Sequence, residues 1–341
     1  MAWLQSRNEI AAGAGADRNP RNNEIGLRKP ARSRYVLEPN DAARENSHCI
    51  RRNEVEGAFM THPVTGIDHC YLLVNDLDRS LEQFRGLGFT ISPRGFHSEK
   101  MGSANHTIMF AADDYFELLG IVAPTEENAG KRALLNKDGE GLYAIACRID
   151  DAREARRELA ALGIATGEVV DFERPVTLPA GGEAVAAFSI LQFDKTEVPL
   201  GIAFMCQHRT RDTVWLPELM RHPNGAKGLA GAVAASDDPR AAAKAYARLY
   251  RAGQLREVDG GYEVKTGSVP LTFLTREALA GRYEGIDVSR TPTHAFAVLR
   301  IAVEDLDRAR KAIAVPLHET PRGLATAPAA TSGAIVEFIE Q

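Results

Sequence analysis

The stretch that decides the fold is GIDHCYLLVND, residues 66–76, an apolar run that ends in an aspartate. Its length and apolar character predict a buried β-strand. Apolar residues then recur at helical spacing, at Leu77, Leu81 and Phe84, and glycines follow at 86 and 88. Aspartate is a preferred helix N-cap and glycine is common just beyond a helix end, so the pattern predicts a strand, a capped helix and a turn.

The same pattern of strand, aspartate and helix occurs three more times. The further copies are residues 142–149 with Asp151, 229–235 with Asp238 before Pro239, and 297–303 with Asp305. Strand-like runs follow the helices, at 89–93, 105–111 and 115–122, then 165–172, 184–193 and 199–206, then 255–264 and 269–274, and finally 334–339. Four such repeats predict an α+β protein of tandem βαβββ modules, paired into two half-open, curved mixed sheets.

The N-terminal segment differs in composition from the repeats. Residues 1–60 are rich in Arg and Asn and have no periodic apolar pattern, so we expect a disordered tail or sequence upstream of the true start at Met60. A chain of 341 residues exceeds the usual size of one domain. We therefore expect a first domain of two modules over 61–208, a linker over 209–226, and a second, degenerate module pair over 227–341.

Composition excludes several classes of protein. The net charge is −5, with 41 Lys and Arg against 46 Asp and Glu, which provides no general attraction to nucleic acid or to an anionic membrane. No apolar stretch has the length needed to cross a bilayer. The four cysteines have no CxxC spacing, and Cys70 and Cys147 lie in apolar runs, which indicates reduced thiols in a cytoplasmic protein. The expected partner is a small molecule, and the chain could also form a homodimer.

Several motifs resemble the vicinal oxygen chelate superfamily, and more narrowly its glyoxalase-like domain proteins. They are GIDH at 66–69, SPRG at 92–95, GSAN at 102–105, DDYFELLGI at 113–121 and the stretch 207–226. The resemblance covers roughly residues 61–341, is strongest over 66–226, and makes 61–208 the expected glyoxalase-like domain. It implies that a histidine on a module's first strand and a glutamate on its last strand bind a divalent metal ion.

In the first module the resemblance places these metal ligands at His69 and Glu117. The second module has Ala144 at the histidine position and no carboxylate on its last strand. Glu337 repeats the position of Glu117 in the fourth module, where we expect it to face solvent. Two ligands are too few for a tight iron, manganese, zinc or nickel site, so a third must come from elsewhere or the metal has been lost.

The third ligand is expected from His106 or His208. His106 lies on a predicted strand next to that of Glu117, and His208 follows the last strand of the second module. The alternative for the first pair is that Glu117 forms an ion pair with Arg94 and that His69 donates to a backbone carbonyl. These alternatives remain open at the level of sequence.

Two functions follow from these residues. The first is a metal-dependent lyase, isomerase or dioxygenase acting on a small oxygen-bearing substrate, with Glu117 and His106 as catalytic residues. Its expected substrate-binding residues are Tyr71, Arg94, Asn105, Phe110 and Phe204. The second is a metal-free binding or drug-sequestering protein, whose aromatic cleft would include Tyr71, Phe110, Phe116 and Phe204 and in which His69 and Glu117 would pair with each other.

Overall fold

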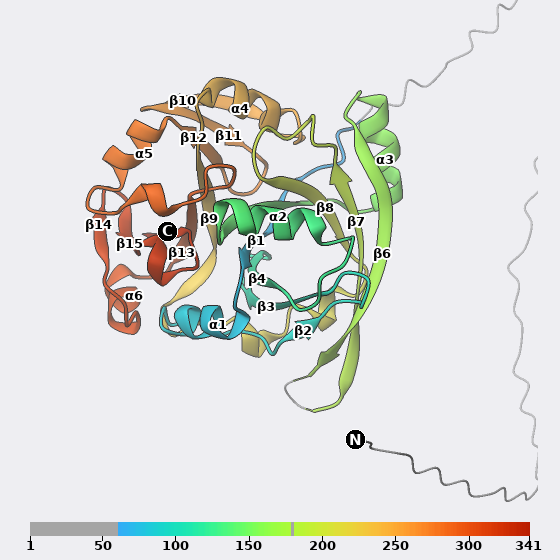
Figure 1. Ribbon diagram of the computed structural model, residues 1–341, viewed down its shortest axis with the longest axis horizontal. Helices are drawn as coiled ribbons and strands as arrows, with labels where there is room; N and C mark the ends of the chain where they lie inside the picture. The colour runs from blue at the N-terminus through green and yellow to red at the C-terminus, as the bar shows by residue number, and fades with distance from the viewer. Residues whose placement is uncertain (1–60, 179–180) are drawn as a thin grey trace, which may run out of the picture. The chain divides into compact units, whose positions relative to one another are not determined.

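Two eight-stranded mixed sheets make up the structure, a computed structural model that describes residues 61–178 and 181–341 (Figure 1). The first sheet has the order β2-β3-β4-β1-β5-β8-β7-β6, and the second has the order β10-β11-β12-β9-β13-β16-β15-β14. The first contains β1 (Gly66–Val74), β2 (Gly95–Phe96), β3 (Ser103–Met109), β4 (Tyr115–Ile121), β5 (Gly141–Arg148), β6 (Thr166–Thr177), β7 (Glu183–Phe193) and β8 (Ile202–His208). The second contains β9 (Ala226–Ala235), β10 (Gln254–Val258), β11 (Gly261–Lys265), β12 (Leu271–Leu274), β13 (Val298–Val303), β14 (His318–Thr320), β15 (Gly323–Ala325) and β16 (Ile335–Glu340).

The strand order confirms four βαβββ modules. In each module the last strand lies parallel to the first, as β4 does to β1 and β16 does to β13. Modules pair through their antiparallel first strands, β1 with β5 and β9 with β13. The predicted α+β class and the two curved mixed sheets are therefore confirmed. The expectations for residues 1–60 lie outside the described residues.

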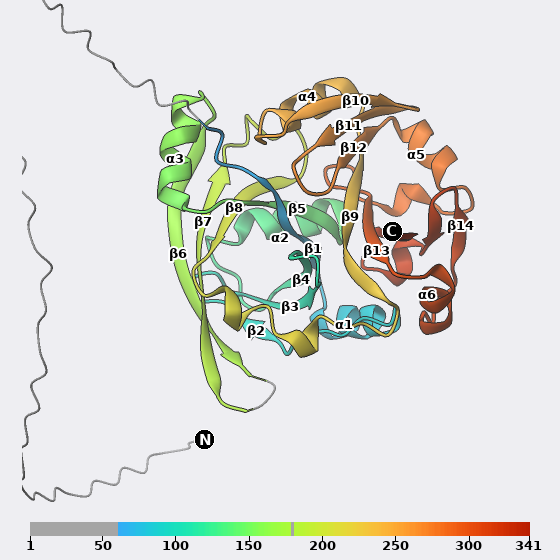
Figure 2. The same cartoon turned by 180° about the vertical axis from the view of Figure 1, so that it is seen from behind.

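The four predicted helix starts are also confirmed. Asp76, Asp151, Asp238 and Asp305 each accept a hydrogen bond from a backbone N–H in the first turn of the helix that follows. These helices are α1 (Leu77–Arg85), α3 (Ala152–Ala161), α4 (Pro239–Ala247) and α6 (Leu306–Ala312). Seen from both sides, α3 lies along β6 and β7 and α4 lies over β11 and β12 (Figure 2).

Some elements differ from the prediction. The expected strand at 89–93 is wrong, because a two-residue β2 pairs with β3 instead. The run 255–264 is a hairpin of β10 and β11, since Gly260, with φ +72°, forms its turn. The sequence patterns do not predict the helices α2 (Ala129–Asp138) and α5 (Arg276–Arg282). In α2 no residue is buried and no side chain caps the first turn, so it has neither an apolar face nor a capping residue by which to recognise it. Short 3₁₀ helices occur at Arg211–Thr213, Pro217–Leu219, Val288–Arg290 and Pro328–Ala330.

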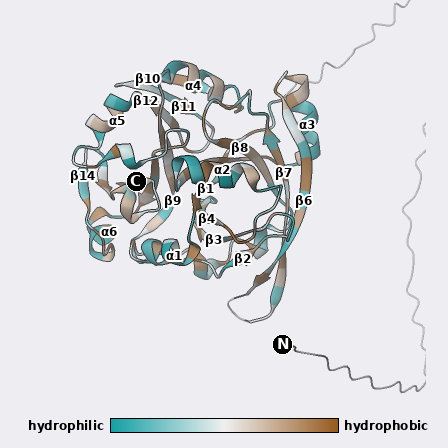
Figure 3. Ribbon diagram, viewed as in Figure 1, coloured by the Kyte–Doolittle hydropathy of each residue, from teal (hydrophilic) through white to brown (hydrophobic). Residues whose placement is uncertain are grey.

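One hydrophobic core joins the two sheets. Phe89 stacks on Phe338 of the second sheet, with ring centroids 5.9 Å apart, and both belong to a single cluster of buried residues. The Cys147 thiol donates to the Tyr250 hydroxyl at 3.3 Å, again between the sheets. Hydrophobic residues run along the strands and hydrophilic ones are frequent on the helices (Figure 3). None of the helices in the described part of the chain is long and apolar enough to cross a membrane.

Candidate active site

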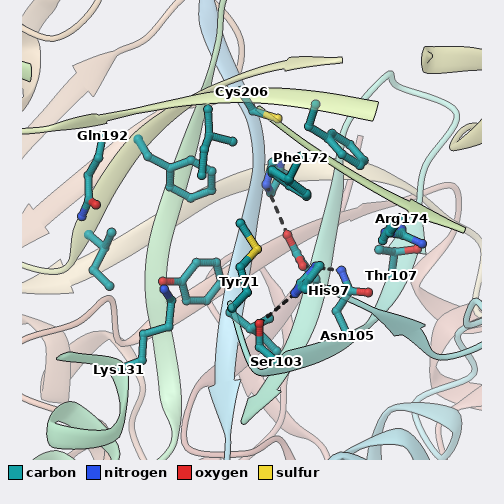
Figure 4. A pocket seen from close by; sticks show the side chains of 18 of the residues that line it. Tyr71, His97, Ser103, Asn105, Thr107, Lys131, Phe172, Arg174, Gln192 and Cys206 are labelled. Atoms are coloured by element: carbon teal, nitrogen blue, oxygen red, sulfur yellow. Dashed lines mark hydrogen bonds and ion pairs between the residues drawn. The ribbon is translucent and has the colours of Figure 1, made fainter. Parts of the chain in front are cut away.

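A cavity of about 180 Å³ lies on the face of the first sheet that is turned away from this core (Figure 4). Successive side chains of a strand point to opposite faces, so its lining residues alternate along the strands. They are 69 and 71 on β1, 103, 105 and 107 on β3, 115, 117 and 119 on β4, 172 and 174 on β6, 188, 190 and 192 on β7, and 202, 204 and 206 on β8. Most side chains from β3 and β4 are polar, while those from β7 and β8 are mainly apolar.

His69 and Glu117 meet in this cavity. His69 Nε2 lies 3.3 Å from Glu117 Oε1, and Asn105 Nδ2 donates to the second oxygen of Glu117 at 2.7 Å. The His69 ring also stacks on Tyr115, with ring centroids 4.3 Å apart. The alternative in which Glu117 pairs with Arg94 is therefore wrong, because Arg94 donates to Asp78 at 2.6 Å instead.

Asp68 holds the other side of His69. The pairing of β1 with β5 shifts register between Ile67 and His69, and such a bulge breaks the strict alternation of side chains along a strand. Asp68 Oδ1 accepts hydrogen bonds from His69 Nδ1 at 2.7 Å and from His208 Nε2 at 2.9 Å. One carboxylate thus orients two imidazole rings, and the alternative in which His69 donates to a backbone carbonyl is also wrong.

These contacts set the charges of the site. Burial by itself lowers the pKa of His69, but the hydrogen bonds and charges of Asp68 and Glu117 outweigh it and raise this pKa to about 9. Burial raises the pKa of Glu117, but the hydrogen bond and the charge of His69 bring it down to about 2. The pKa of Asp68 also lies well below its usual range, since its hydrogen bonds with His208 and His69 outweigh burial. At neutral pH the site therefore holds an imidazolium between two carboxylates.

The donor atoms of His69 and Glu117 fit a divalent metal ion. Two neighbouring ligands of one ion with bonds near 2.1 Å lie roughly 3 Å apart, close to the 3.3 Å between His69 Nε2 and Glu117 Oε1. Histidine ligands commonly donate their second ring N–H to a carboxylate, as His69 does to Asp68. The pair can therefore hold a metal ion.

Further donors lie near His69. Among the described residues, His69, Cys206 and His208 form the one set of three metal-binding side chains whose donor atoms lie within 4.8 Å of one another. His208 Nδ1 is buried without a hydrogen-bond partner, and Trp215 packs on the ring with centroids 4.8 Å apart. Cys206 lines the cavity, and burial raises the pKa of its thiol well above the usual value.

The second module supplies no equivalent pair of ligands. In the first module, His69 pairs with Tyr115 and Tyr71 with Glu117 across the parallel strands β1 and β4. The corresponding pairs on β5 and β8 are Ala144 with Ile202 and Ala146 with Phe204. Phe204 thus takes the position of Glu117, and Ala144 takes that of His69. Any ion at this site would have at most two ligands from the positions that the resemblance implies.

Four expected site residues lie elsewhere. His106 is on the opposite face of β3 from Asn105, because strand residues alternate, and its Nδ1 contacts the carbonyl oxygen of Ser92 at 2.9 Å. Phe110 is fully buried in the core that joins the sheets, as is Phe116. Arg94 is outside the cavity. The expectation that these side chains line the site is therefore wrong, whereas Tyr71, Asn105 and Phe204 do line it.

The cavity also contains residues that sequence reasoning missed. His97 lies in the loop after β2, and its Nδ1 contacts Ser103 Oγ at 2.8 Å (Figure 4). Burial lowers the pKa of His97 to about 4, so it is neutral at physiological pH. Arg174 from β6 and Lys131 from the unpredicted helix α2 complete the polar lining. No strand or helix pattern placed these three residues near the site; only the tertiary structure brings them together.

Comparison with solved structures supports the fold. A hypothetical protein from Staphylococcus aureus has a TM-score of 0.58 at 14% identity, over 81% of this chain and 99% of its own. A variant of 4-hydroxymandelate synthase from Streptomyces coelicolor has a TM-score of 0.49 at 13% identity, over 82% and 93% of the two chains. Methylmalonyl-CoA epimerase from Mycobacterium tuberculosis has a TM-score of 0.35 at 19% identity, over 44% and 93%. Only the first of these TM-scores exceeds 0.5, and at 14% identity that likeness concerns the fold alone.

Comparison by sequence identifies the family. No curated protein shows a significant match to the chain. The family described as glyoxalase-like domain matches residues 67–250, which is more than half of the chain and includes the whole cavity. With its four βαβββ modules and this match, the chain belongs to the glyoxalase-like domain family of the vicinal oxygen chelate superfamily.

Proposed function

We propose that the cavity is the active site of an enzyme that acts on a small oxygen-bearing molecule, and that His69 and Glu117 bind a divalent metal ion there. The observation that carries this proposal is the convergence of His69 Nε2 and Glu117 Oε1 on the cavity, 3.3 Å apart. Each side chain is held by a further group, His69 by Asp68 and Glu117 by Asn105. Such outer contacts orient the ligands of a metal ion.

In this proposal the metal ion, Glu117 and the aromatic residues of the cavity have separate roles. A bound iron, manganese, zinc or nickel ion would act as a Lewis acid toward substrate oxygens. If Glu117 does not coordinate the ion, its Oε1, which faces the cavity beside His69, has the geometry of a general base instead. Tyr71 and Phe204, whose ring centroids lie 6.2 Å apart, would contact the apolar part of the substrate. Lyase, isomerase and dioxygenase chemistry are all compatible with this arrangement.

A metal-free binding protein is the second candidate. It is favoured by Ala144 and Phe204, which replace half of the expected ligand positions, and by the direct contact between His69 and Glu117. In that case the ion pair is a structural part of the cavity wall, and the apolar side chains of β7 and β8 provide the binding surface.

Metal content separates the two candidates. We would purify the protein without chelator or polyhistidine tag and measure bound metals by elemental mass spectrometry, for the wild type, His69→Ala and Glu117→Gln. Matched controls are His106→Ala, on the opposite face of the sheet, and Glu173→Gln, an exposed residue of β6. Far-UV circular dichroism of every variant checks that it is folded.

The enzyme proposal expects about one ion per chain in the wild type and in both controls, and a loss of metal in both site variants. The identity of the metal would then separate oxygen chemistry from Lewis-acid chemistry. A wild type that contains no metal and takes up none of the four ions on dialysis would overturn the proposal in favour of the binding protein. Metal retained by the folded site variants would overturn the assignment to His69 and Glu117.

A further inference from the structure

Arg174 lines the cavity and has no partner among the residues that the structure describes. Among the described residues its half-buried guanidinium makes neither a hydrogen bond nor an ion pair, although it lines the cavity. Arg300 in the second sheet is the contrasting case, because its Nε donates to Glu337 at 2.7 Å. Guanidinium groups that leave water are normally paired, so the isolation of Arg174 requires an explanation.

Among the described residues, no carboxylate that lines the cavity is free to neutralise Arg174. Burial lowers the pKa of Arg174, and the charges of Glu117 and Tyr115 offset this only in part. Both Glu117 oxygens already have partners, since His69 contacts one and Asn105 donates to the other. Lys131, the other cation of the cavity wall, enters from the opposite side and has Glu127 nearby (Figure 4). The positive charge at Arg174 is thus unmatched within the cavity.

The chain keeps space open around this guanidinium. A Cβ atom on Gly95 would lie 2.7 Å from a terminal nitrogen of Arg174 and 2.8 Å from Asn105 Oδ1. Asn105 Oδ1 is buried and has no hydrogen-bond partner. The glycine at position 95 therefore leaves space for the Arg174 guanidinium next to Asn105 Oδ1, which lacks a hydrogen-bond partner.

Apolar side chains lie directly next to Arg174. Phe172 is two residues earlier on β6, so both side chains project from the same face of the strand. Phe172 stacks on Phe188 of β7, with ring centroids 5.0 Å apart. A cation beside two stacked rings suits a ligand that has a negative charge at one end and an apolar body at the other.

We infer that the cavity selects small carboxylates with an aromatic or aliphatic body, and that Arg174 binds the carboxylate while Phe172 and Phe188 contact the body. This inference rests on the proposal that the cavity is the substrate site, and it holds whether or not His69 and Glu117 bind a metal. The volume of about 180 Å³ is below the roughly 300–1,000 Å³ of sites for drug-sized ligands, which limits the ligand to a small molecule. Arginine is suited to the task because its planar fork matches a carboxylate.

The test compares phenylacetate with its neutral amide, phenylacetamide, by isothermal titration calorimetry on full-length protein dialysed against chelator. Removing metals separates this test from the one on metal content. The variants are Arg174→Gln and Arg174→Lys, and the matched control is Arg156→Gln, which removes a surface arginine of α3 that pairs with Glu168. Circular dichroism again verifies the fold of each variant.

We expect the wild type and Arg156→Gln to bind phenylacetate more tightly than phenylacetamide. Arg174→Gln should weaken phenylacetate binding about tenfold or more and leave the amide unchanged, because only the charged hydrogen bonds are lost. Arg174→Lys should recover part of the affinity for phenylacetate, since lysine keeps the positive charge but not the planar guanidinium that binds a carboxylate through two N–H groups. Equal binding of acid and amide, an unchanged affinity in folded Arg174→Gln, or no binding of phenylacetate would each overturn the inference.

Discussion

At the residue scale, Glu117 and Glu337 show how one neighbour decides the role of a carboxylate. Both lie at the same position of a module's last strand. In the backbone register with the parallel first strand, Glu117 lies opposite Tyr71 and Glu337 lies opposite Arg300. Arg300 donates to Glu337 at 2.7 Å, and neither side chain is accessible beyond 1%. The expectation that Glu337 faces solvent is therefore wrong. Glu117 thus lines a cavity with a histidine as its partner, whereas Glu337 is fully buried and paired with an arginine.

Removing the charge of Glu337 should destabilise the protein. In Glu337→Gln, Arg300 would remain buried without a counter-charge, while Tyr283 and Thr320, which also donate to Glu337, would lose a charged acceptor. We expect the free energy of unfolding to fall by about 3 kcal/mol, measured by urea denaturation.

A double variant provides the control. Arg300→Met combined with Glu337→Leu removes both charges and should recover most of the lost stability, since no buried charge is left unpaired. If the double variant were as unstable as Glu337→Gln, packing rather than charge would explain the loss.

At the element scale, the four modules share an aspartate cap at the start of the helix. Asp238 accepts a hydrogen bond from the N–H of Ala241 at 2.9 Å, and Pro239 occupies the first turn of α4. The other three modules have the same aspartate cap. The helices without such a start differ: α2 has no side-chain cap, and α5 uses Thr275 instead. A cap of this kind satisfies a backbone donor that the helix itself leaves free.

Asp238→Ala should therefore lower the free energy of unfolding by about 1 kcal/mol. The neighbouring Asp237 is equally exposed and makes no cap, so Asp237→Ala should have little effect. Chemical denaturation of the two variants side by side measures the difference. An equal loss in both would show that the charge of this turn, and not the cap, stabilises α4.

At the scale of the whole molecule, a buried carboxylate joins the two sheets. Asp114, just before β4, accepts a hydrogen bond from the backbone N–H of Leu229 on β9 at 3.0 Å. The sheets approach closely here, because a Cβ atom on Gly228 would lie 2.7 Å from the Cβ of Ala112. Burial raises the pKa of Asp114 to about 7, although the Leu229 bond and the charge of Arg148 lower it in part.

The raised pKa predicts a pH-dependent stability. Between its ordinary value of 3.8 and about 7, Asp114 keeps its proton in the folded protein but loses it in the unfolded chain. The folded state binds more protons in this range, so the stability from this group is complete below about pH 4 and falls as the pH rises toward 7. Asp114→Asn removes this titration and keeps an oxygen that can accept from Leu229.

We expect the stability of Asp114→Asn relative to the wild type to increase by on the order of 1–4 kcal/mol between pH 4 and pH 8. Urea denaturation across this range measures it, with Asp237→Asn as the exposed control. A difference that stays constant with pH would contradict the buried titration of Asp114.

The sequence by itself determined the repeating unit, the number of modules and the helix caps. These features depend on local patterns, namely apolar runs, capping residues and glycines, which physical chemistry translates directly into strands and helix ends. Such patterns do not say which strands are neighbours across a sheet. Nor do they place Arg94, which pairs with Asp78 on α1.

Only the tertiary structure decided which side chains share the cavity. Because side chains alternate along β3, His106 points away from the cavity and Asn105 points into it. A bulge in β1 places the Asp68 side chain beside His69. The placement of β6 at the far edge of the sheet, curved over the cavity, brought in Arg174 from a residue with no local signal. The physical reason is that contacts between strands distant in sequence depend on sheet order and curvature, which no short stretch of the chain encodes.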